Sequence, residues 1–565
     1  MKQFETQVLI IGAGAAGVRA AIELEQHGVE TLVLGKREHG DAHTTWARGG
    51  INASLGTLDP EDSWAIHAAD TLDEGHYIND ESMVETVARD MPYRIRELEE
   101  WGMDFSRTDD GRIAQRYFGA QSFRRTCFAG DHTGESLLDT LVDKAKELDT
   151  AYRENTYITE LVTEDDRVVG AYGFDMDTGE RLLFASEATV VAAGGYAGIY
   201  NRHSSRDDEN NGDGVALTYD VGAEVMDTEF MQFHPTGMVG DRYGDEWDGR
   251  LVTEAVRGEG GRLYNAEGDR FMNEYSPDQM ELDARDVVAR AIWTEIQDGR
   301  GTENDGVYLD ISHLDEVFIR ERLPRMCERF QQLGVNIAEE PMEVAPTTHY
   351  SMGGVRIDPD TGYTGVDGLY VAGETTVGVH GANRLGGNSL AETVVYGKQI
   401  GSHLVTELSG EILSIEPPAG SRIERLDKTG EYEPSEMYDT LRSTLQEHVG
   451  VERSEESLET AKEVLSSLPD TPELLDVHSV SDLETASNYL YSLTVARLLV
   501  DGALRREESR GAHYRTDCPE KSDEWQTNIV YKRDSKPQHT SPTSPSETVQ
   551  QALDENHELD YHHLE

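Results

Sequence analysis

The sequence has few cysteines, few basic residues and no long apolar run, and each shortage excludes a class of protein. The 565 residues include three cysteines, Cys127, Cys327 and Cys518, which lie far apart and form no CxxC pair. An iron–sulfur cluster needs about four thiolates, so we do not expect this chain to hold one alone, and a disulfide scaffold is also disfavoured. No apolar run approaches the ~20 residues of a membrane helix, and the N-terminus lacks a signal-peptide pattern. We therefore expect a cytoplasmic protein without direct membrane insertion.

Basic charge is scarce relative to acidic charge. There are 109 acidic residues against 50 basic ones, which gives a net charge of -59. Such an excess would repel the phosphates of nucleic acid, so a nucleic-acid partner is excluded. The acidic residues are spread along the chain, which favours a protein that works in high salt, where screening removes self-repulsion.

The N-terminal region has the pattern of a strand, a glycine-rich turn, a helix and a second strand. Residues 7–11 have the pattern of a buried strand, Gly12, Gly14 and Gly17 follow, and a helical pattern then leads to a second strand at residues 31–34. In this arrangement the glycines allow a tight turn, a close approach to a pyrophosphate and close helix packing. The turn therefore predicts dinucleotide binding, with an ordinary glycine-rich turn as the alternative.

Two later apolar runs, 188–193 and 368–372, also end in glycine, so we expect the nucleotide-binding sheet to be assembled from distant parts of the chain. An acid that binds the ribose is often found at the end of the second strand. Here that place holds Gly35 and Lys36. The ribose contact is therefore unassigned.

A series of motifs in the same order along the chain resembles the flavoprotein subunit of succinate dehydrogenase and fumarate reductase, including its archaeal forms. The motifs are residues 43–53 (HTTWARGGINA), 105–107 (FSR), 115–119 (QRYFG), 131–134 (DHTG), 232–237 (QFHPTG), 252–254 (VTE), 257–261 (RGEGG), 285–290 (RDVVAR), 349–354 (HYSMGG) and 380–390 (HGANRLGGNSL). The resemblance covers roughly residues 5–530. It implies an FAD-dependent oxidoreductase that interconverts succinate and fumarate by hydride transfer to or from flavin N5.

The expected fold class is α/β, with a Rossmann-like FAD-binding domain, an inserted α+β capping domain and a C-terminal helical domain. We expect the FAD-binding domain in two parts, residues 1–230 and 346–408, with the capping domain at 231–345 between them. The helical domain is expected at residues 430–530, followed by a disordered acidic tail at 535–565.

The resemblance and the glycine pattern together assign the cofactor-binding residues. They are Gly12, Gly14, Ala15, Gly17, Lys36, His43, Gly49, Gly50, Asp213, Glu374, Asn388, Ser389 and Leu390. In the family, the histidine at the position of His43 carries a covalent flavin bond. Here Asp41 and Ala42 precede it, unlike the family's usual sequence. Covalent and non-covalent FAD both remain open, and no metal site is expected.

The substrate residues follow from the same resemblance. A C4-dicarboxylate needs cationic or hydrogen-bond-donating groups at both ends. The family places His234, Thr253, His349 and Arg384 there, with Phe118 beside them. It assigns the proton to the arginine at the position of Arg285, and a relay of carboxylates to Glu254 and Asp286.

Two alternatives stay open at this point. L-aspartate oxidase has the same fold, but its members carry a Glu-Gly-Gly stretch that meets the substrate ammonium, where this chain has Phe118 and no acid nearby. The second alternative is a non-catalytic flavoprotein scaffold, against which the matched His234, Arg285, His349 and Arg384 argue. The resemblance also implies a separate iron–sulfur subunit, through which the chain would be peripheral at the inner face of a membrane.

The charge analysis predicts that folding depends on salt. We expect the protein to lose its structure on dialysis from molar salt into low-salt buffer, because the repulsion among its acidic residues is then no longer screened. Far-UV circular dichroism before and after dialysis measures this. An unchanged spectrum in low salt would contradict a halophilic protein.

Overall fold

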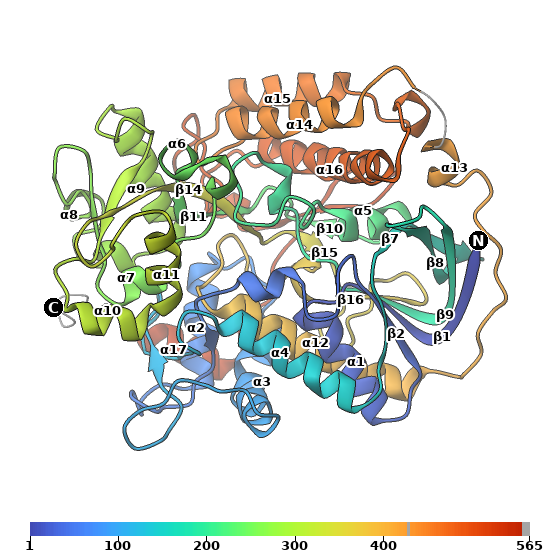
Figure 1. Ribbon diagram of the computed structural model, residues 1–565, viewed down its shortest axis with the longest axis horizontal. Helices are drawn as coiled ribbons and strands as arrows, with labels where there is room; N and C mark the ends of the chain where they lie inside the picture. The colour runs from blue at the N-terminus through green and yellow to red at the C-terminus, as the bar shows by residue number, and fades with distance from the viewer. Residues whose placement is uncertain (427–429, 556–565) are drawn as a thin grey trace.

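The computed structural model describes residues 1–426 and 430–555 (Figure 1). Its largest sheet has seven strands in the order β6-β2-β1-β9-β8-β7, with β16 also paired to β9. Strand β1 (Lys2–Ile11) runs parallel to β2 (Thr31–Leu34) on one side and to β9 (Arg181–Val191) on the other. Strand β16 (Leu369–Val371) extends the parallel part of the sheet beyond β9. Segments almost 370 residues apart in sequence therefore share one sheet, as the apolar runs ending in glycine predict.

The other strands of this sheet complete its two edges. Strand β6 (Ala151–Arg153) pairs in parallel with β2 at one edge. Strands β7 (Thr156–Glu164) and β8 (Arg167–Asp175) form an antiparallel pair that joins the sheet through β9.

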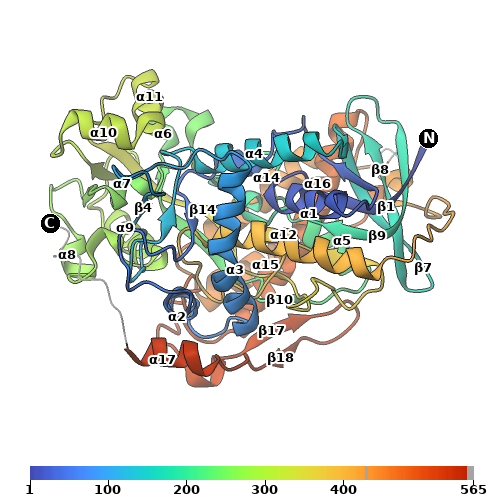
Figure 2. The ribbon, with the colours of Figure 1, turned by 90° about the horizontal axis from the view of Figure 1, so that it is seen from below.

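Two long helices pack together beside this sheet. Helix α1 (Ala15–Gln26) follows β1 directly, and α12 (Asn388–Glu407) lies against it (Figure 2). Gly397 of α12 allows the close approach, because a Cβ there would lie 2.5 Å from the carbonyl oxygen of Ala16. The N-termini of both helices are thereby brought to the same side of the fold.

The inserted region forms its own sheet and its own core. The strand order is β11-β14-β13-β12, with bounds Met231–Met238, Met342–Ser351, Val307–Asp310 and Arg262–Tyr264. Helix α9 (Arg285–Gln297) packs on β11 and β14, and α11 (Pro324–Gln332) lies on the side of this region toward the middle of the molecule (Figure 1). A separate apolar cluster that includes Val252, Ile292 and Phe330 fills the interior.

The region after α12 is mainly helical. Helices α14 (Pro434–His448), α15 (Glu455–Ser467) and α16 (Val480–Arg505) pack against one another at the top of Figure 1. Helix α16 begins with a capping box on Ser479. None of the helices in the described parts of the chain combines the length and the apolarity that crossing a bilayer demands.

The expected disordered tail is wrong for residues 535–555. Strand β18 (Gln538–Thr540) pairs with β17 (Asn528–Tyr531), and helix α17 (Glu547–Glu555) packs on α2 (Trp64–Glu74). This segment is polar on average, but Val549 and Ala552 lie three residues apart on one face of α17 and are buried. The rest of that expectation, at residues 556–565, lies outside the described residues.

Candidate functional site

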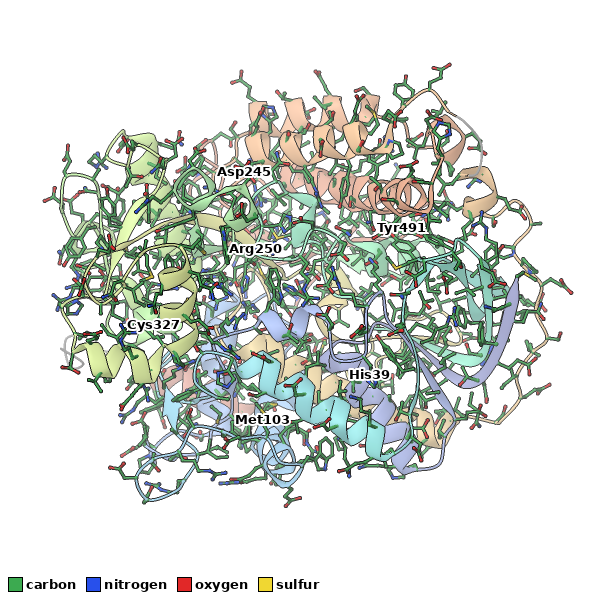
Figure 3. The ribbon with its side chains drawn as sticks, viewed as in Figure 1. His39, Met103, Asp245, Arg250, Cys327 and Tyr491 are labelled. Atoms are coloured by element: carbon green, nitrogen blue, oxygen red, sulfur yellow. The ribbon has the colours of Figure 1, made fainter. Side chains whose placement is uncertain are left out.

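One continuous cavity of 540 Å³ connects the glycine-rich turn of the large sheet to the inserted region. Its lining comes from the N-terminal part of the chain, from the inserted region and from the segment after residue 370, so that it lies where these three parts meet. Arg250, labelled in Figure 3, marks the part of the cavity near the inserted region.

At the nucleotide end of the cavity, the backbone of Gly12 lies close to the end of a neighbouring strand because glycine has no side chain. Gly12 has φ +116°, and a Cβ there would lie 2.0 Å from the carbonyl oxygen of Ala192. The N-terminus of α1 lies directly beyond it, and Ser389 and Leu390 at the start of α12 line the same space. Two helix N-termini that face one cavity favour an anionic group there.

Lys36 and Asp213 meet in this end of the cavity. Lys36 Nζ lies 2.9 Å from Asp213 Oδ2 at the first turn of α5 (Asp213–Asp220). Burial lowers the pKa of Lys36, but Asp213 outweighs this effect, so the net shift is upward and the ammonium stays charged. The lysine that replaces the usual ribose-binding acid is therefore a fixed cation beside a fixed carboxylate.

His43 lies in the cavity wall beside charged groups. Burial, with further effects of Arg206 and Arg250, lowers the pKa of His43 to about 4. Burial raises the pKa of the neighbouring Glu209 to about 7, and the two side chains are 3.8 Å apart. The imidazole of His43 is therefore neutral near pH 7, and its buried Nδ1 has no hydrogen-bond partner among the residues that the structure describes.

In the inserted region, the buried imidazole of His234 and the half-buried imidazole of His349 face each other. The rings of His234 and His349 are 5.2 Å apart, centre to centre, and burial lowers the pKa of both well below the usual value. The backbone N–H of Thr236 donates to His234 Nδ1 at 3.2 Å, so the proton of this neutral ring is assigned to Nε2. Nε2 is buried and has no partner within the described residues. It is thus an available donor.

Arg384 supplies a cation without a carboxylate partner in the described chain. Its guanidinium lies 4.4 Å from the ring centre of Tyr350, and its buried Nε has no hydrogen-bond partner there. Burial, with the repulsion of Arg285, lowers its pKa to about 9. An uncompensated buried guanidinium calls for an anion to bind.

Arg285, at the start of α9, is held in place by two partners. Its Nε donates to Glu254 Oε2 at 2.8 Å, its Nη2 also bonds to that oxygen, and its Nη1 donates to Gln232 at 2.9 Å. Burial favours a raised pKa for Glu254, but Arg285 and Arg257 outweigh it and hold the pKa at about 2. The other oxygen of Glu254 accepts a hydrogen bond from the backbone N–H of Gly119.

A second chain of hydrogen bonds leads away from Arg285. Gln232 donates to Asn383 at 2.8 Å, and Asn383 Nδ2 donates at 2.7 Å to both Glu74 and Asp286. These two carboxylates line a separate cavity of 640 Å³. Burial and the nearby Asp286 raise the pKa of Glu74 well above its usual value.

Most of the residues that the sequence predicts for the site line the first cavity. They are Gly12, Gly14, Ala15, Lys36, His43, Gly49, Gly50, Phe118, Asp213, His234, Thr253, Glu254, Arg285, His349, Glu374, Arg384, Ser389 and Leu390. Gly17, Asp286 and Asn388 do not line it. Gly17 packs on Gly12, and Asn388 bonds to Asn52, His67 and Thr71.

Sequence reasoning missed two buried residues next to Arg285. Arg257 Nη2 lies 3.9 Å from a carboxylate oxygen of Glu254, and its Nε and Nη2 have no hydrogen-bond partner in the described residues. Gln232 holds Arg285 on the other side. Both lie inside motifs already quoted, so the spacing was visible, but only the fold shows that they converge.

Two known protein families match this chain. A family described as "FAD binding domain" matches residues 7–390, and "Fumarate reductase flavoprotein C-term" matches residues 438–554. The chain belongs to the succinate dehydrogenase/fumarate reductase flavoprotein family. Its C-terminal match extends through α17, in agreement with an ordered segment there.

Similar proteins span nearly the whole chain. A fumarate reductase (CoM/CoB) subunit of Methanothermobacter marburgensis is 44% identical and covers 95% of this chain and 98% of its own. The succinate dehydrogenase flavoprotein subunit of Coxiella burnetii is 37% identical, with 94% and 95% covered. A solved E. coli quinol fumarate reductase is 30% identical, with 97% of this chain and 99% of that chain covered and a TM-score of 0.88.

This flavoprotein is accordingly an FAD-dependent oxidoreductase, and its cavity fits the cofactor. The glycine-lined turn leaves room for a pyrophosphate, and the two helix N-termini face an anion. Glu374, whose pKa burial raises to about 7, accepts a hydrogen bond from the backbone N–H of Ser351 at 3.1 Å beside the same space. The individual contacts of these residues with FAD stay predictions.

The buried neutral His234 predicts a pH dependence of stability. Below pH 6.5 the unfolded chain binds a proton on this histidine that the folded chain does not, so stability falls as pH falls. His234→Gln should therefore lose less free energy of unfolding between pH 7.5 and 5.5 than the wild type, by about 1.4 kcal/mol. Denaturant titrations at both pH values measure this.

His539→Gln is the matched control, since His539 is exposed and should leave the difference unchanged. An equal pH effect in the wild type and in His234→Gln would show that His234 is protonated in the folded protein.

Proposed function

We propose that this flavoprotein interconverts succinate and fumarate. The observation that carries the proposal is the convergence of Arg384, His234 and His349 beside Arg285 in the cavity that also holds the FAD-binding turn. A guanidinium without a carboxylate partner and two neutral imidazoles can bind both ends of a small dicarboxylate. The similarity to named fumarate reductases and succinate dehydrogenases supports the same substrate class.

One proposed binding group contributes positive charge, and the others contribute hydrogen bonds. Arg384 offers a bidentate contact to one carboxylate. His234 offers the proton on Nε2 to the other, together with the hydroxyl of Thr253, which lines the same cavity. Phe118, which is buried against Gly49, excludes water from the space between.

Arg285 is placed to handle the proton at the substrate carbon. Bound FAD supplies the hydride acceptor for succinate or the donor for fumarate. The guanidinium is normally always protonated, so it suits donation at a developing carbanion followed by immediate reprotonation. Glu254 bonds to Nε and Nη2 of Arg285, and Arg257 lies beyond it, so these two buried groups are the proposed path for that proton.

Electrons must leave or reach the cavity through another protein. We propose that this partner is an iron–sulfur subunit, with association at the inner face of a membrane through it. The three cysteines of this chain are free and separate, and the named relatives are themselves subunits.

An assay of three substrates tests the function. Purified protein in high salt should oxidise succinate with an artificial dye and reduce fumarate with a reduced dye. It should not release hydrogen peroxide with L-aspartate, because the stretch around Phe118 carries no acid that could meet the substrate ammonium. Peroxide from aspartate without dye reduction by succinate would identify L-aspartate oxidase instead.

Arg285→Gln should abolish turnover and leave FAD bound. The variant removes the group that donates the proton, and general acid catalysis contributes roughly 10²- to 10⁴-fold. Steady-state rates and the flavin absorbance of the purified variant measure the two effects.

Arg320→Gln is the control, since Arg320 is exposed on α10 (Glu316–Arg322) of the same inserted region and pairs with Glu316 at 2.8 Å. Full activity in Arg285→Gln would end the proposed role.

A further inference from the structure

Three arginines differ from most others in this acidic chain. Typical arginines of the inserted region have a carboxylate within 4.0 Å, as Arg320 and Arg322 do. Within the described residues, Arg48, Arg250 and Arg329 have none, although acidic residues outnumber basic ones by 109 to 50. Arg384, which we propose binds the substrate, also has no carboxylate within 4.0 Å in the described residues.

All three line the cavity that holds the proposed active site. Arg48 precedes Gly49 in the N-terminal part, Arg250 lies three residues before Thr253, and Arg329 is on α11. They therefore approach the cavity from both sides of the seam between the FAD-binding part and the inserted region. Each is half-buried, so water reaches this part of the cavity. Figure 3 shows Arg250 at this seam.

Neutral groups hold two of these guanidiniums in place. Arg250 lies 4.3 Å from the ring centre of Trp46 and donates to the carbonyl oxygen of Ser205 at 3.2 Å. Arg329 lies 5.8 Å from the ring centre of Trp247 and donates to the carbonyl oxygen of Leu251 at 3.3 Å. Aromatic faces and carbonyls orient a cation without cancelling its charge.

No carboxylate of the described residues lies within 4.0 Å of the three arginines. Asp131 acts on Arg48 and Arg329 from farther away, and Asp207 acts on Arg250, and each of them raises the pKa of the arginine. Asp41 and Glu209 line the cavity too, but they lie near Arg206, at 2.6 and 3.7 Å. Glu246 is exposed and contributes its backbone carbonyl to Arg250. Burial lowers the pKa of Arg329 to about 10, with further lowering by Arg48 and Arg250, and the side chain stays charged at neutral pH.

A dianion that approaches this flavoprotein meets a net charge of -59. Repulsion of that size lowers its local concentration and its rate of entry unless a cationic region offsets it. In concentrated salt the long-range part is screened, but contacts at a few ångströms persist. The three half-buried arginines in the wall of the cavity supply such a region.

We propose that Arg48, Arg250 and Arg329 form an entrance subsite that binds the C4-dicarboxylate before it reaches Arg384 and His234. This subsite rests on the proposed function, because it takes the same substrate class. It assigns these arginines to capture of the substrate and not to the chemical step.

Arg329→Gln tests the entrance subsite. It should lower kcat/KM for fumarate about tenfold and leave kcat and the flavin content unchanged. The slope of kcat/KM against ionic strength should also become shallower, over the salt range in which circular dichroism shows a folded protein. Arg329→Lys should retain most of kcat/KM because it keeps the charge.

Arg320→Gln is the matched control, since it removes the same charge from a neighbouring helix outside the cavity. Equal kcat/KM in Arg329→Gln and Arg320→Gln would overturn the subsite, as would a loss of flavin or an equal fall in kcat. If the wild type turns over neither succinate nor fumarate, the proposed function itself fails, and the subsite with it. If the wild type is active and Arg329→Gln does not change kcat/KM, only the entrance subsite is ruled out.

Discussion

The buried ion pair between Arg285 and Glu254 organises the site. One oxygen of Glu254 receives Arg285, and the other receives the backbone N–H of Gly119, so a single carboxylate joins the inserted region to the FAD-binding part. Removing one partner of a buried pair leaves an uncompensated charge, which costs about 3–5 kcal/mol. The pair therefore keeps the inserted region aligned over the cavity and keeps the proposed proton donor in one orientation.

Acidic residues predominate in the chain as a whole, whereas arginines without a carboxylate partner in the described residues line the main cavity. Acidic residues predominate overall, and most arginines are paired with them. The main cavity departs from this rule: Arg384 and the three entrance arginines have no carboxylate within 4.0 Å in the described chain. Neutral imidazoles at His234 and His349 add hydrogen-bond donors without adding further repulsion among the cations. The cavity thus favours a doubly anionic ligand in a chain that otherwise repels anions.

Much of the fold could be predicted because its signals are local. The glycine-rich turn, the apolar strands and the helical stretches appear close to their expected positions, and the family comparison confirms the FAD-binding and C-terminal helical architecture. The tail was predicted wrongly because composition averages over residues. The stripe of Val549 and Ala552 is too short to outweigh many polar neighbours, yet it is enough to pack α17 on α2.

The sequence by itself determined the residue types and their order, because motifs such as those at 232–237 and 380–390 record local chemistry. Only the tertiary structure decided which of these residues share a space. It places Asp286 in a second cavity, ties Asn388 to Asn52, and brings Arg48 near Arg250 and Arg329 across about 280 residues of chain. Convergence of that kind depends on how distant segments pack, and no spacing along the chain encodes it.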